Sequence, residues 1–348
     1  MEQFPHSKPS VGVDEALELL DEVSKGAIGS GECTKEFEER MRAYTKREYS
    51  KCTSSGTTAI QLALRAQSIG IGDEVIIPSY VCYSVMSAVD AVGARPVFAD
   101  IGKNSPNITR KSIESKMTGM TKNVIVPHMF GHRADIDKIQ ELGLPVIEDC
   151  AQAIGGSTIG SKGDVSILSF YATKILACAR GGMVLTDDKN VYDRLDDLMQ
   201  YDGRESAGEC YNFSMTNLEA AIGLVQLEKL NGFIRKRNQI GKIYDNILKN
   251  QGLEETILRR PKGSIVGRYV LRLPEHKNLD EVIGKMKKEG IDCRKPVFRP
   301  LHTYLNSGNY PNTMNAYSRN ISLPVYPGLE ESHADYIGKK LVKIIKNS

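Results

Sequence analysis

From about residue 13 to residue 230, segments with helical spacing of apolar residues alternate with short runs rich in β-branched residues. The alternation predicts amphipathic helices from Asp14 and over Thr58–Ala66. It predicts strands over 74–77, 96–99, 123–127, 144–147 and 165–170. Strands separated by helices are typical of a mostly parallel sheet that is covered by helices on both faces. The pattern therefore predicts an α/β fold for the larger part of the chain.

A second, smaller α/β unit is predicted at the C-terminal end. Thr216-Asn217-Leu218-Glu219 is a capping box that opens a long helix, which continues towards Leu248. Beyond this helix the pattern predicts a strand over 265–273, a helix over 279–289, a strand over 291–298 and a final helix from Glu331. We place the domain boundary near the long helix, with a large domain over residues 1–235 and a small domain over residues 236–348.

Composition narrows the class of protein. The chain has 348 residues, of which 41% are hydrophobic, so it is long enough to bury a large core. Its net charge of +3 comes without a basic stripe, which disfavours nucleic-acid binding. No apolar run approaches the ~18 residues of a membrane span, and the N-terminus lacks the pattern of a signal peptide. The seven cysteines are scattered without CxxC spacing, which indicates neither a zinc site nor a disulfide scaffold and suits the cytoplasm.

Two short segments, each at the end of a predicted strand, carry the chemistry. Asp149 lies in Glu148-Asp149-Cys150-Ala151-Gln152-Ala153, and Lys174 ends Ser169-Phe170-Tyr171-Ala172-Thr173-Lys174. Pyridoxal phosphate needs an Asp that keeps its pyridine nitrogen protonated and a Lys that forms a Schiff base and moves protons. Either residue alone is more often a helix cap or a solvated side chain. Together, in this order, they predict a pyridoxal phosphate site with Lys174 and Asp149 as catalytic residues.

Further residues fit the rest of that cofactor. Ser55, Gly56, Thr57 and Thr58 precede an apolar helix, whose free N–H groups and positive dipole end favour a phosphate. Ser169 adds a hydroxyl five residues before Lys174. Gln152, three residues past Asp149, is placed to reach the phenolic oxygen. Tyr83, in a loop after a predicted strand, either stacks on the cofactor ring or packs in the core.

The histidines suggest no metal site. His128 and His132 are four residues apart, but Pro127 and Gly131 break the helix that would align them, so we interpret both as structural. His302 either lines a substrate pocket or lies at the surface.

Taken together, these segments resemble the DegT/DnrJ/StrS family, the sugar aminotransferase branch of fold-type I pyridoxal phosphate enzymes. The resemblance runs nearly end to end. It is carried by Phe37-Glu38, Ser55-Gly56-Thr57, Gly72 to Ser79, Glu148 to Ala153, Ser169 to Lys174, Gly181-Gly182, Asn212 to Leu227, and Ser322-Leu323-Pro324.

The resemblance implies the fold-type I transferase fold and a role for each matching residue. Lys174 would carry the cofactor as a Schiff base, Asp149 would bind the pyridine nitrogen, and Gln152 would lie near the phenolic oxygen. Ser169, with Gly56, Thr57 and Thr58, would bind the phosphate. Asn212 would reach the phosphate of the neighbouring subunit, which implies a homodimer with shared active sites.

Two positions depart from the family pattern. Cys82 stands where an aromatic side chain usually covers the cofactor ring, so the ring contact falls to Tyr83 or to the smaller thiol. Ala179-Arg180 stands where a Gly-Glu pair is common. Arg180 either favours an anionic substrate or donor, or is a surface change.

The predicted function is transfer of an amino group from an amino acid, glutamate or glutamine, to a keto sugar that is linked to a nucleotide. Such a reaction serves the biosynthesis of amino sugars, polysaccharides or antibiotics. The alternatives are transamination of a cyclitol or another keto compound, a lyase reaction, and a non-catalytic regulator. The retained Lys174 argues against a regulator and against the dehydratase branch of the family, in which His replaces that lysine.

Overall fold

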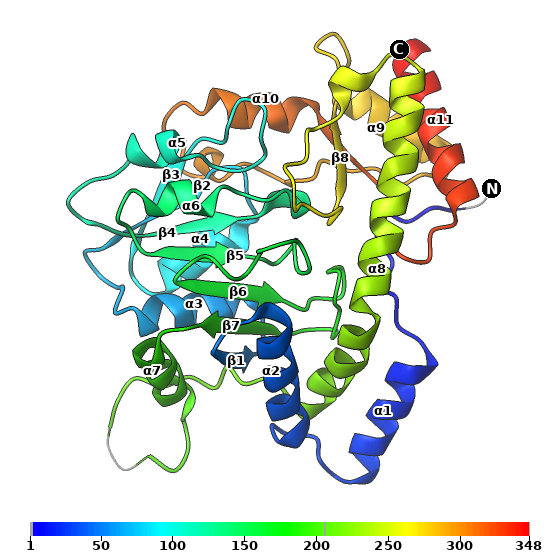
Figure 1. Cartoon of the computed structure of the whole chain (residues 1–348). Helices are drawn as coiled ribbons and strands as arrows, with labels where there is room; N and C mark the ends of the chain where they lie inside the picture. Colours follow the sequence, from blue (N-terminus) through cyan, green and yellow to red (C-terminus); the bar gives the residue numbers. More distant parts are fainter. Residues whose placement is uncertain (1–2, 205–206, 348) are drawn as a thin grey trace.

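The computed structural model describes residues 3–204 and 207–347 of the chain (Figure 1). Within these residues, seven strands form the main sheet in the order β1-β7-β6-β5-β4-β2-β3. The strands are β1 (Tyr49–Thr53), β2 (Glu74–Pro78), β3 (Arg95–Ala99), β4 (Thr121–Pro127), β5 (Val146–Asp149), β6 (Val165–Ser169) and β7 (Gly182–Thr186). Strand β7 runs antiparallel to β1 and β6, whereas β6, β5, β4, β2 and β3 pair in parallel. The predicted mostly parallel sheet is confirmed.

Helices cover both faces of this sheet. On one face α3 packs against α4 and α7 and also contacts β6 and β7. Near the other face α2 contacts β1 and the long helix α8 (Asn217–Asn250). The helices in this part of the chain are α1 (Val13–Ser24), α2 (Glu32–Thr45), α3 (Gly56–Ala66), α4 (Tyr83–Ala91), α5 (Arg110–Glu114), α6 (Ile136–Gln140), α7 (Lys189–Met199) and the 3₁₀ helix η1 (Met129–Gly131).

Alternation along β6 divides the core into two layers. Val165 and Ile167 belong to the hydrophobic cluster that includes α3 and α4, whereas Leu168 belongs to the cluster with Phe37 of α2 and Leu224 of α8. Successive strand side chains point to opposite faces, so one strand supplies both layers. Burial on both faces explains the apolar runs of the central strands, such as residues 75–77 of β2 and 124–126 of β4.

The C-terminal part forms a smaller α/β unit around a two-stranded antiparallel sheet, β8 (Tyr269–Arg272) and β9 (Asn320–Leu323). A separate hydrophobic cluster joins this sheet to the neighbouring helices. The remaining elements are α9 (Leu279–Lys288), α10 (Pro311–Arg319), α11 (Glu331–Asn347), η2 (Glu254–Thr256) and η3 (Leu301–Thr303).

Helix α8 (Asn217–Asn250) joins the two parts. It is 34 residues long and begins with the predicted capping box, in which Thr216 Oγ1 accepts from the N–H of Glu219. Figure 1 shows α1 and α2 beside one end of α8 and α11 beside the other, and the same helices contact α8. The boundary expected between residues 235 and 236 falls inside this continuous helix and stays a prediction. No helix in the described residues is both long enough and apolar enough to cross a lipid bilayer.

Two predicted strands of the small unit differ from the structure. The segment over 291–298 forms no strand; its backbone makes isolated bridges from Ile291 to Phe4 and from Arg294 to Ser322, and Pro296 lacks an N–H for a longer ladder. The strand expected over 265–273 is confined to β8. Its first residues instead donate to the carbonyls of Phe130 and Gly131 and so tie the small unit to the large one.

Candidate active site

A cavity of about 500 Å³ lies where the carboxyl ends of β5 and β6 meet the amino ends of α3 and α4. This volume suits a small molecule, and the carboxyl edge of an open parallel sheet is the usual ligand position. The cavity is lined by Ser55, Gly56, Thr57, Ile60, Val81, Cys82, Ser84, Val85, Asp149, Ala151, Gln152, Ile167, Ser169, Tyr171, Thr173, Lys174, Arg180, Gly181 and Arg268.

The amino end of α3 forms one wall. Ser55 is the N-cap residue, and its Oγ accepts from the N–H of Thr58 at 3.1 Å. The hydroxyl of Thr58 accepts from the N–H of Ser55 and donates to the carbonyl of Ser55. Both side chains therefore take part in the cap. The N–H groups of Gly56 and Thr57 are the first of the helix and have no carbonyl one turn earlier to bind. They remain as donors for an anion.

Close packing explains the glycine in this wall. A Cβ on Gly56 would lie 2.8 Å from Cβ of Ser169, and a Cβ on Gly182 would lie 2.4 Å from the backbone of Ser55. The start of α3 therefore lies directly against β6 and β7, and a bridge between Ser55 and Gly181 fixes the contact. This arrangement brings Ser169 to the same end of the cavity as Gly56 and Thr57.

Asp149 is the last residue of β5 and is 7% exposed. Its Oδ1 accepts from the N–H of Ala151 at 2.9 Å, and within the described residues no other group donates to the carboxylate. Burial raises the pKa of Asp149, although the Ala151 N–H and the charge of Lys174 oppose the shift. The carboxylate is thus short of donors in a low-dielectric position.

Lys174 lies in the irregular segment between β6 and β7. This segment is held by hydrogen bonds from the N–H of Lys174 to the carbonyl of Tyr171 and from the N–H of Cys178 to the carbonyl of Phe170. Burial lowers the pKa of Lys174; the charge of Asp149 opposes this shift and that of Arg268 adds to it. A lysine amine with a lowered pKa is more often neutral and therefore nucleophilic.

This donor set fits pyridoxal phosphate. Backbone N–H groups and hydroxyls at the α3 end match a phosphate, the under-satisfied carboxylate of Asp149 matches a protonated ring nitrogen, and the amine of Lys174 matches an aldehyde. The glycine at residue 56 keeps the phosphate end of the cavity open, because a side chain there would collide with Ser169.

The structure brings most of the predicted residues together. Ser55, Gly56, Thr57, Cys82, Asp149, Gln152, Ser169 and Lys174 all line the cavity. Three other predicted residues, Thr58, Tyr83 and Asn212, are not among the described residues that line it. Tyr83 is 48% exposed, and its ring centroid lies 5.1 Å from that of Tyr304. Asn212 is exposed on the segment that precedes α8.

One residue has a contact beyond its expected one, one departs from its sequence interpretation, and one was not predicted. Gln152 faces the cavity, but its Oε1 also accepts from the N–H of Phe130 at 3.2 Å. His302 is buried against Ser79 and lies outside the lining set, so it is neither a pocket residue nor a surface one. Arg268, in the turn before β8, was not foreseen, because a lone arginine ahead of a strand carries no motif.

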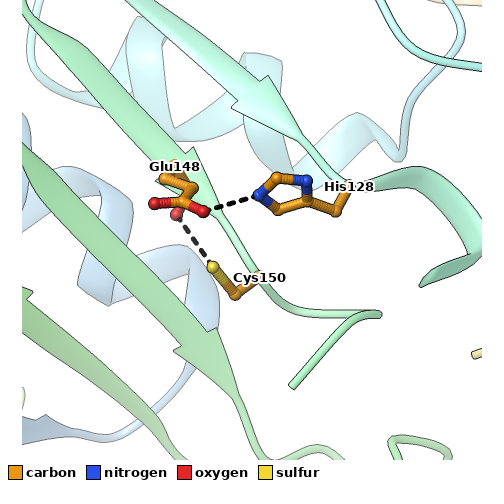
Figure 2. Close-up of side chains that lie close together, drawn as sticks. All are labelled: His128, Glu148 and Cys150. Atoms are coloured by element: carbon orange, nitrogen blue, oxygen red, sulfur yellow. Dashed lines mark hydrogen bonds and ion pairs between the residues drawn. The ribbon is translucent and has the colours of Figure 1, made fainter. Parts of the chain in front are cut away.

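A buried cluster behind Asp149 has metal-ligand residue types but is fully hydrogen-bonded (Figure 2). Nε2 of His128 donates to Oε1 of Glu148 at 2.8 Å, and Nδ1 of the same ring accepts from the N–H of Ala134. Both oxygens of Glu148 accept further backbone N–H groups, and the Cys150 thiol donates to the backbone carbonyl of Glu148. No lone pair of the His128 or Glu148 side chain remains for a cation, which agrees with a structural role for His128.

Comparison with known proteins gives consistent results. A model of the DegT/DnrJ/EryC1/StrS aminotransferase family matches residues 10–342. The chain is 31% identical over 380 residues to the spore coat polysaccharide biosynthesis protein SpsC of Bacillus subtilis (strain 168). This alignment covers 99% of this chain and 98% of that protein. It is also 32% identical over 362 residues to the GDP-perosamine synthase of Escherichia coli O157:H7, in an alignment that covers 97% of each protein.

Among solved structures, ntda from Bacillus subtilis with bound cofactor PMP superposes with a TM-score of 0.89 at 25% identity, covering 97% of this chain and 83% of that one.

Proposed function

The chain belongs to the DegT/DnrJ/EryC1/StrS aminotransferase family, and from this premise we propose that it uses pyridoxal phosphate to move an amino group from an amino acid to a nucleotide-linked keto sugar. The family, the fold and the aminotransferase class predicted from the sequence are confirmed. The cofactor contacts, the donor, the acceptor and the assembly are the proposed parts.

The observation that supports the proposal is the convergence of Lys174, Asp149 and the amino end of α3 on one cavity. The N–H groups of Gly56 and Thr57 and the hydroxyl of Ser169 bind the phosphate. Asp149 binds the protonated ring nitrogen, which satisfies its buried carboxylate. When bound, pyridoxal phosphate supplies an electron sink that stabilises negative charge at the donor α-carbon.

Lys174 has two tasks at one atom. Its Nζ would hold the cofactor before the donor arrives. Once released, the neutral amine would take the proton from the donor α-carbon and later give it back. The lowered pKa of Lys174 suits this base role because a neutral amine needs no prior deprotonation. The same residue moves protons in the opposite direction when the keto sugar accepts the amino group.

The remaining contacts follow from the lining residues. Cys82 and Gln152 line the cavity, so Cys82 would face the cofactor ring in place of the exposed Tyr83, and Gln152 would reach the phenolic oxygen. The names of the two relatives, one in polysaccharide synthesis and one making a nucleotide-linked amino sugar, favour a nucleotide-linked acceptor. We further propose a homodimer in which Asn212 serves the partner's cavity. The cytoplasmic location stays a prediction.

Two separate half-reactions test the proposal. The protein loaded with pyridoxal phosphate is mixed with glutamate or glutamine, and loss of the visible band and formation of the keto acid are followed. The aminated form is then mixed with nucleotide-linked 4-keto-6-deoxy sugars and, separately, with a keto-cyclitol. Turnover of a nucleotide sugar supports the proposal, whereas exclusive turnover of the cyclitol, or failure of the first half-reaction with every amino acid, contradicts it.

A further inference from the structure

The cavity wall carries more positive than negative charge. Its cationic side chains are Lys174, Arg180 and Arg268, and its carboxylate is Asp149. Within the described residues neither arginine forms an ion pair with a carboxylate. For Arg268, which is half-buried, this is unusual, whereas Arg180 is exposed. Once the cofactor ring engages Asp149, the two arginines are left to attract anions.

The two arginines lie at different ends of the cavity. Arg180 is exposed and precedes Gly181, which bridges Ser55 at the phosphate end. Arg268 is half-buried in the turn before β8. The N–H of Arg268 donates to the carbonyl of Phe130, and its Nη1 donates to the carbonyl of Pro296, both at 3.0 Å. The backbone of Arg268 is therefore tied to the large unit and its guanidinium to the small one, and no group among the described residues accepts from the other guanidinium N–H groups.

Arg268 and Lys174 line the same cavity, so the charge of one acts on the other. Burial lowers the pKa of Lys174, and the charge of Arg268 lowers it further. The other ionisable groups that act on this amine are Asp149 from β5 and the Cys82 thiol from the turn before α4. Coulomb interactions weaken with distance, so the guanidinium that influences the amine is also the one near the reacting carbon.

We propose that Arg268 binds the α-carboxylate of the amino donor. The inference rests on the proposed function and deepens it. The α-carboxylate and the reacting amine share one carbon, so a donor whose nitrogen takes the place of Lys174 Nζ must put its carboxylate beside this amine. The planar fork of a guanidinium accommodates a carboxylate with two parallel hydrogen bonds.

The contact has an electrostatic consequence. With no carboxylate present, the charge of Arg268 disfavours a proton on the nitrogen of Lys174. A bound carboxylate cancels that charge and so raises the proton affinity of the same nitrogen. Donor binding and the protonation state of the attachment nitrogen are thereby linked. A keto sugar without a carboxylate makes no such contact in the second half-reaction.

The experiment is a pH titration of the visible band of the holoenzyme with succinate, a carboxylate that has no amine to react. Sodium chloride at equal ionic strength controls for screening. In the wild type, succinate should shift the titration midpoint to higher pH. In Arg268→Gln the midpoint should be higher without succinate, and succinate should no longer move it. Arg268→Lys should keep the low starting midpoint, because the charge remains, but should bind succinate more weakly.

Arg272→Gln is the matched control. Arg272 lies on β8 four residues on, and its side chain donates to Asn320 and to the carbonyl of Lys103 instead of facing the cavity. This variant should retain the wild-type succinate response. Thermal midpoints of all variants identify any that are poorly folded. If Arg268→Gln is one of them, the succinate titration of Arg268→Lys decides the test.

Half-reaction kinetics give an independent readout. Arg268→Gln should lower kcat/KM for the amino donor by about 10- to 150-fold, the effect of losing a hydrogen bond to a charged group. The reaction of the aminated form with the keto sugar should change far less. Equal losses in both half-reactions would contradict the assignment.

Failure of this inference is distinguishable from failure of the proposed function. A protein that forms no visible band with pyridoxal phosphate refutes the proposed function and this inference with it. A protein with a normal band whose succinate response survives Arg268→Gln refutes the Arg268 assignment alone. If Arg180→Gln, and not Arg268→Gln, abolished the succinate response, the donor carboxylate would be assigned to Arg180.

Discussion

Two consecutive carboxylates at the end of β5 have opposite surroundings. Glu148 is 0% exposed and Asp149 is 7% exposed, and alternation along the strand directs them to opposite faces of the sheet. Glu148 accepts from His128, from Ser166 and from the backbone N–H groups of residues 160, 162 and 163. Asp149 accepts from the N–H of Ala151 alone among the described residues.

The pKa values follow these contacts. Burial alone raises the pKa of Glu148, but the hydrogen bond from His128 and the backbone donors outweigh it and lower the value to about 2. Burial raises the pKa of Asp149, and too few donors oppose it. A buried carboxylate whose hydrogen-bond donors all come from the protein stabilises the fold. A buried carboxylate with too few donors is a candidate for binding a ligand. Variants on the Asp149 side should therefore lose activity, and variants on the Glu148 side should lose stability.

Lys174→Ala should have the largest effect. It removes the one amine that the described residues bring to the cavity wall, so the visible band of the bound cofactor and amino transfer should both be lost. The thermal midpoint of the apoprotein should stay near that of the wild type. Absorbance, turnover and thermal unfolding check the three parts, with Lys189→Ala on the exposed face of α7 as a control. Borohydride reduction and peptide mapping that place the cofactor on another lysine would disprove the assignment.

Asp149→Asn should lower kcat by about 10²- to 10³-fold, the scale seen when a group that stabilises transition-state charge is removed. The amide cannot hold the proton of the ring nitrogen as a carboxylate does. Because the carboxylate accepts little from the protein, the free energy of unfolding of the apoprotein should not fall. A variant with near wild-type kcat and reduced stability would reverse the comparison and make Asp149 the structural residue.

Glu148→Gln should behave in the opposite way. Its amide nitrogen cannot accept the N–H groups that one oxygen now accepts, so the free energy of unfolding at pH 7 should fall by about 3 kcal/mol, at the lower end of the cost of breaking a buried pair. The folded fraction should retain its turnover. Urea unfolding measures the change, and Glu281→Gln, in an exposed ion pair on α9, is the control with little expected effect.

The pH dependence gives a second measurement of the same contact. The pKa of Glu148 is lower in the folded protein, at about 2, than its ordinary value of 4.5. Its stabilising contribution is therefore complete above pH 4.5 and declines as the pH falls towards 2. The difference in stability between wild type and Glu148→Gln should shrink over that window. A constant difference would show that the carboxylate charge does not contribute.

The sequence was most informative where local chemistry and position in the fold coincide. Asp149, Lys174 and the capping box at Ser55 are readable because each sits at a strand or helix end, and the parallel sheet then brings such ends to one edge. Arg268 was not readable, because its place in the cavity depends on the hydrogen bonds of residues 265 to 268 to Phe130 and Gly131, more than a hundred residues away. Long-range contacts of this kind leave no local pattern.

The same limit explains the errors in secondary structure. The predicted strand over 291–298 has suitable residue types, but its partners Phe4 and Ser322 bind single residues of it and do not extend into a ladder. Strand β9 was missed because it follows α10 without a turn signal and is defined by its pairing with β8. For Tyr83 the sequence left ring stacking and packing open; in the structure its ring lies beside that of Tyr304, and Cys82 lines the cavity.

Asn212→Ala extends the comparison beyond one subunit. Asn212 is exposed and does not line the cavity of its own chain, so a loss of cofactor affinity in this variant would favour a contact from a second chain. Removing one hydrogen bond to the phosphate should weaken cofactor binding by about tenfold or somewhat more. Unlike the Asp149→Asn deficit, this deficit should disappear with excess pyridoxal phosphate. Titration of the apoprotein with the cofactor measures the affinity.

Mixing two inactive variants tests where Asn212 acts. If each cavity combines Lys174 of one chain with Asn212 of its partner, a mixed dimer of Lys174→Ala and Asn212→Ala has one cavity with both residues intact and one with neither. Activity at limiting cofactor should therefore recover after subunit exchange, to at most about half of the wild-type value per mixed dimer. If both residues served the same chain, every cavity would carry one defect and no recovery would follow. Verified exchange without recovery, or a fully active monomer, would confine Asn212 to a local role before α8.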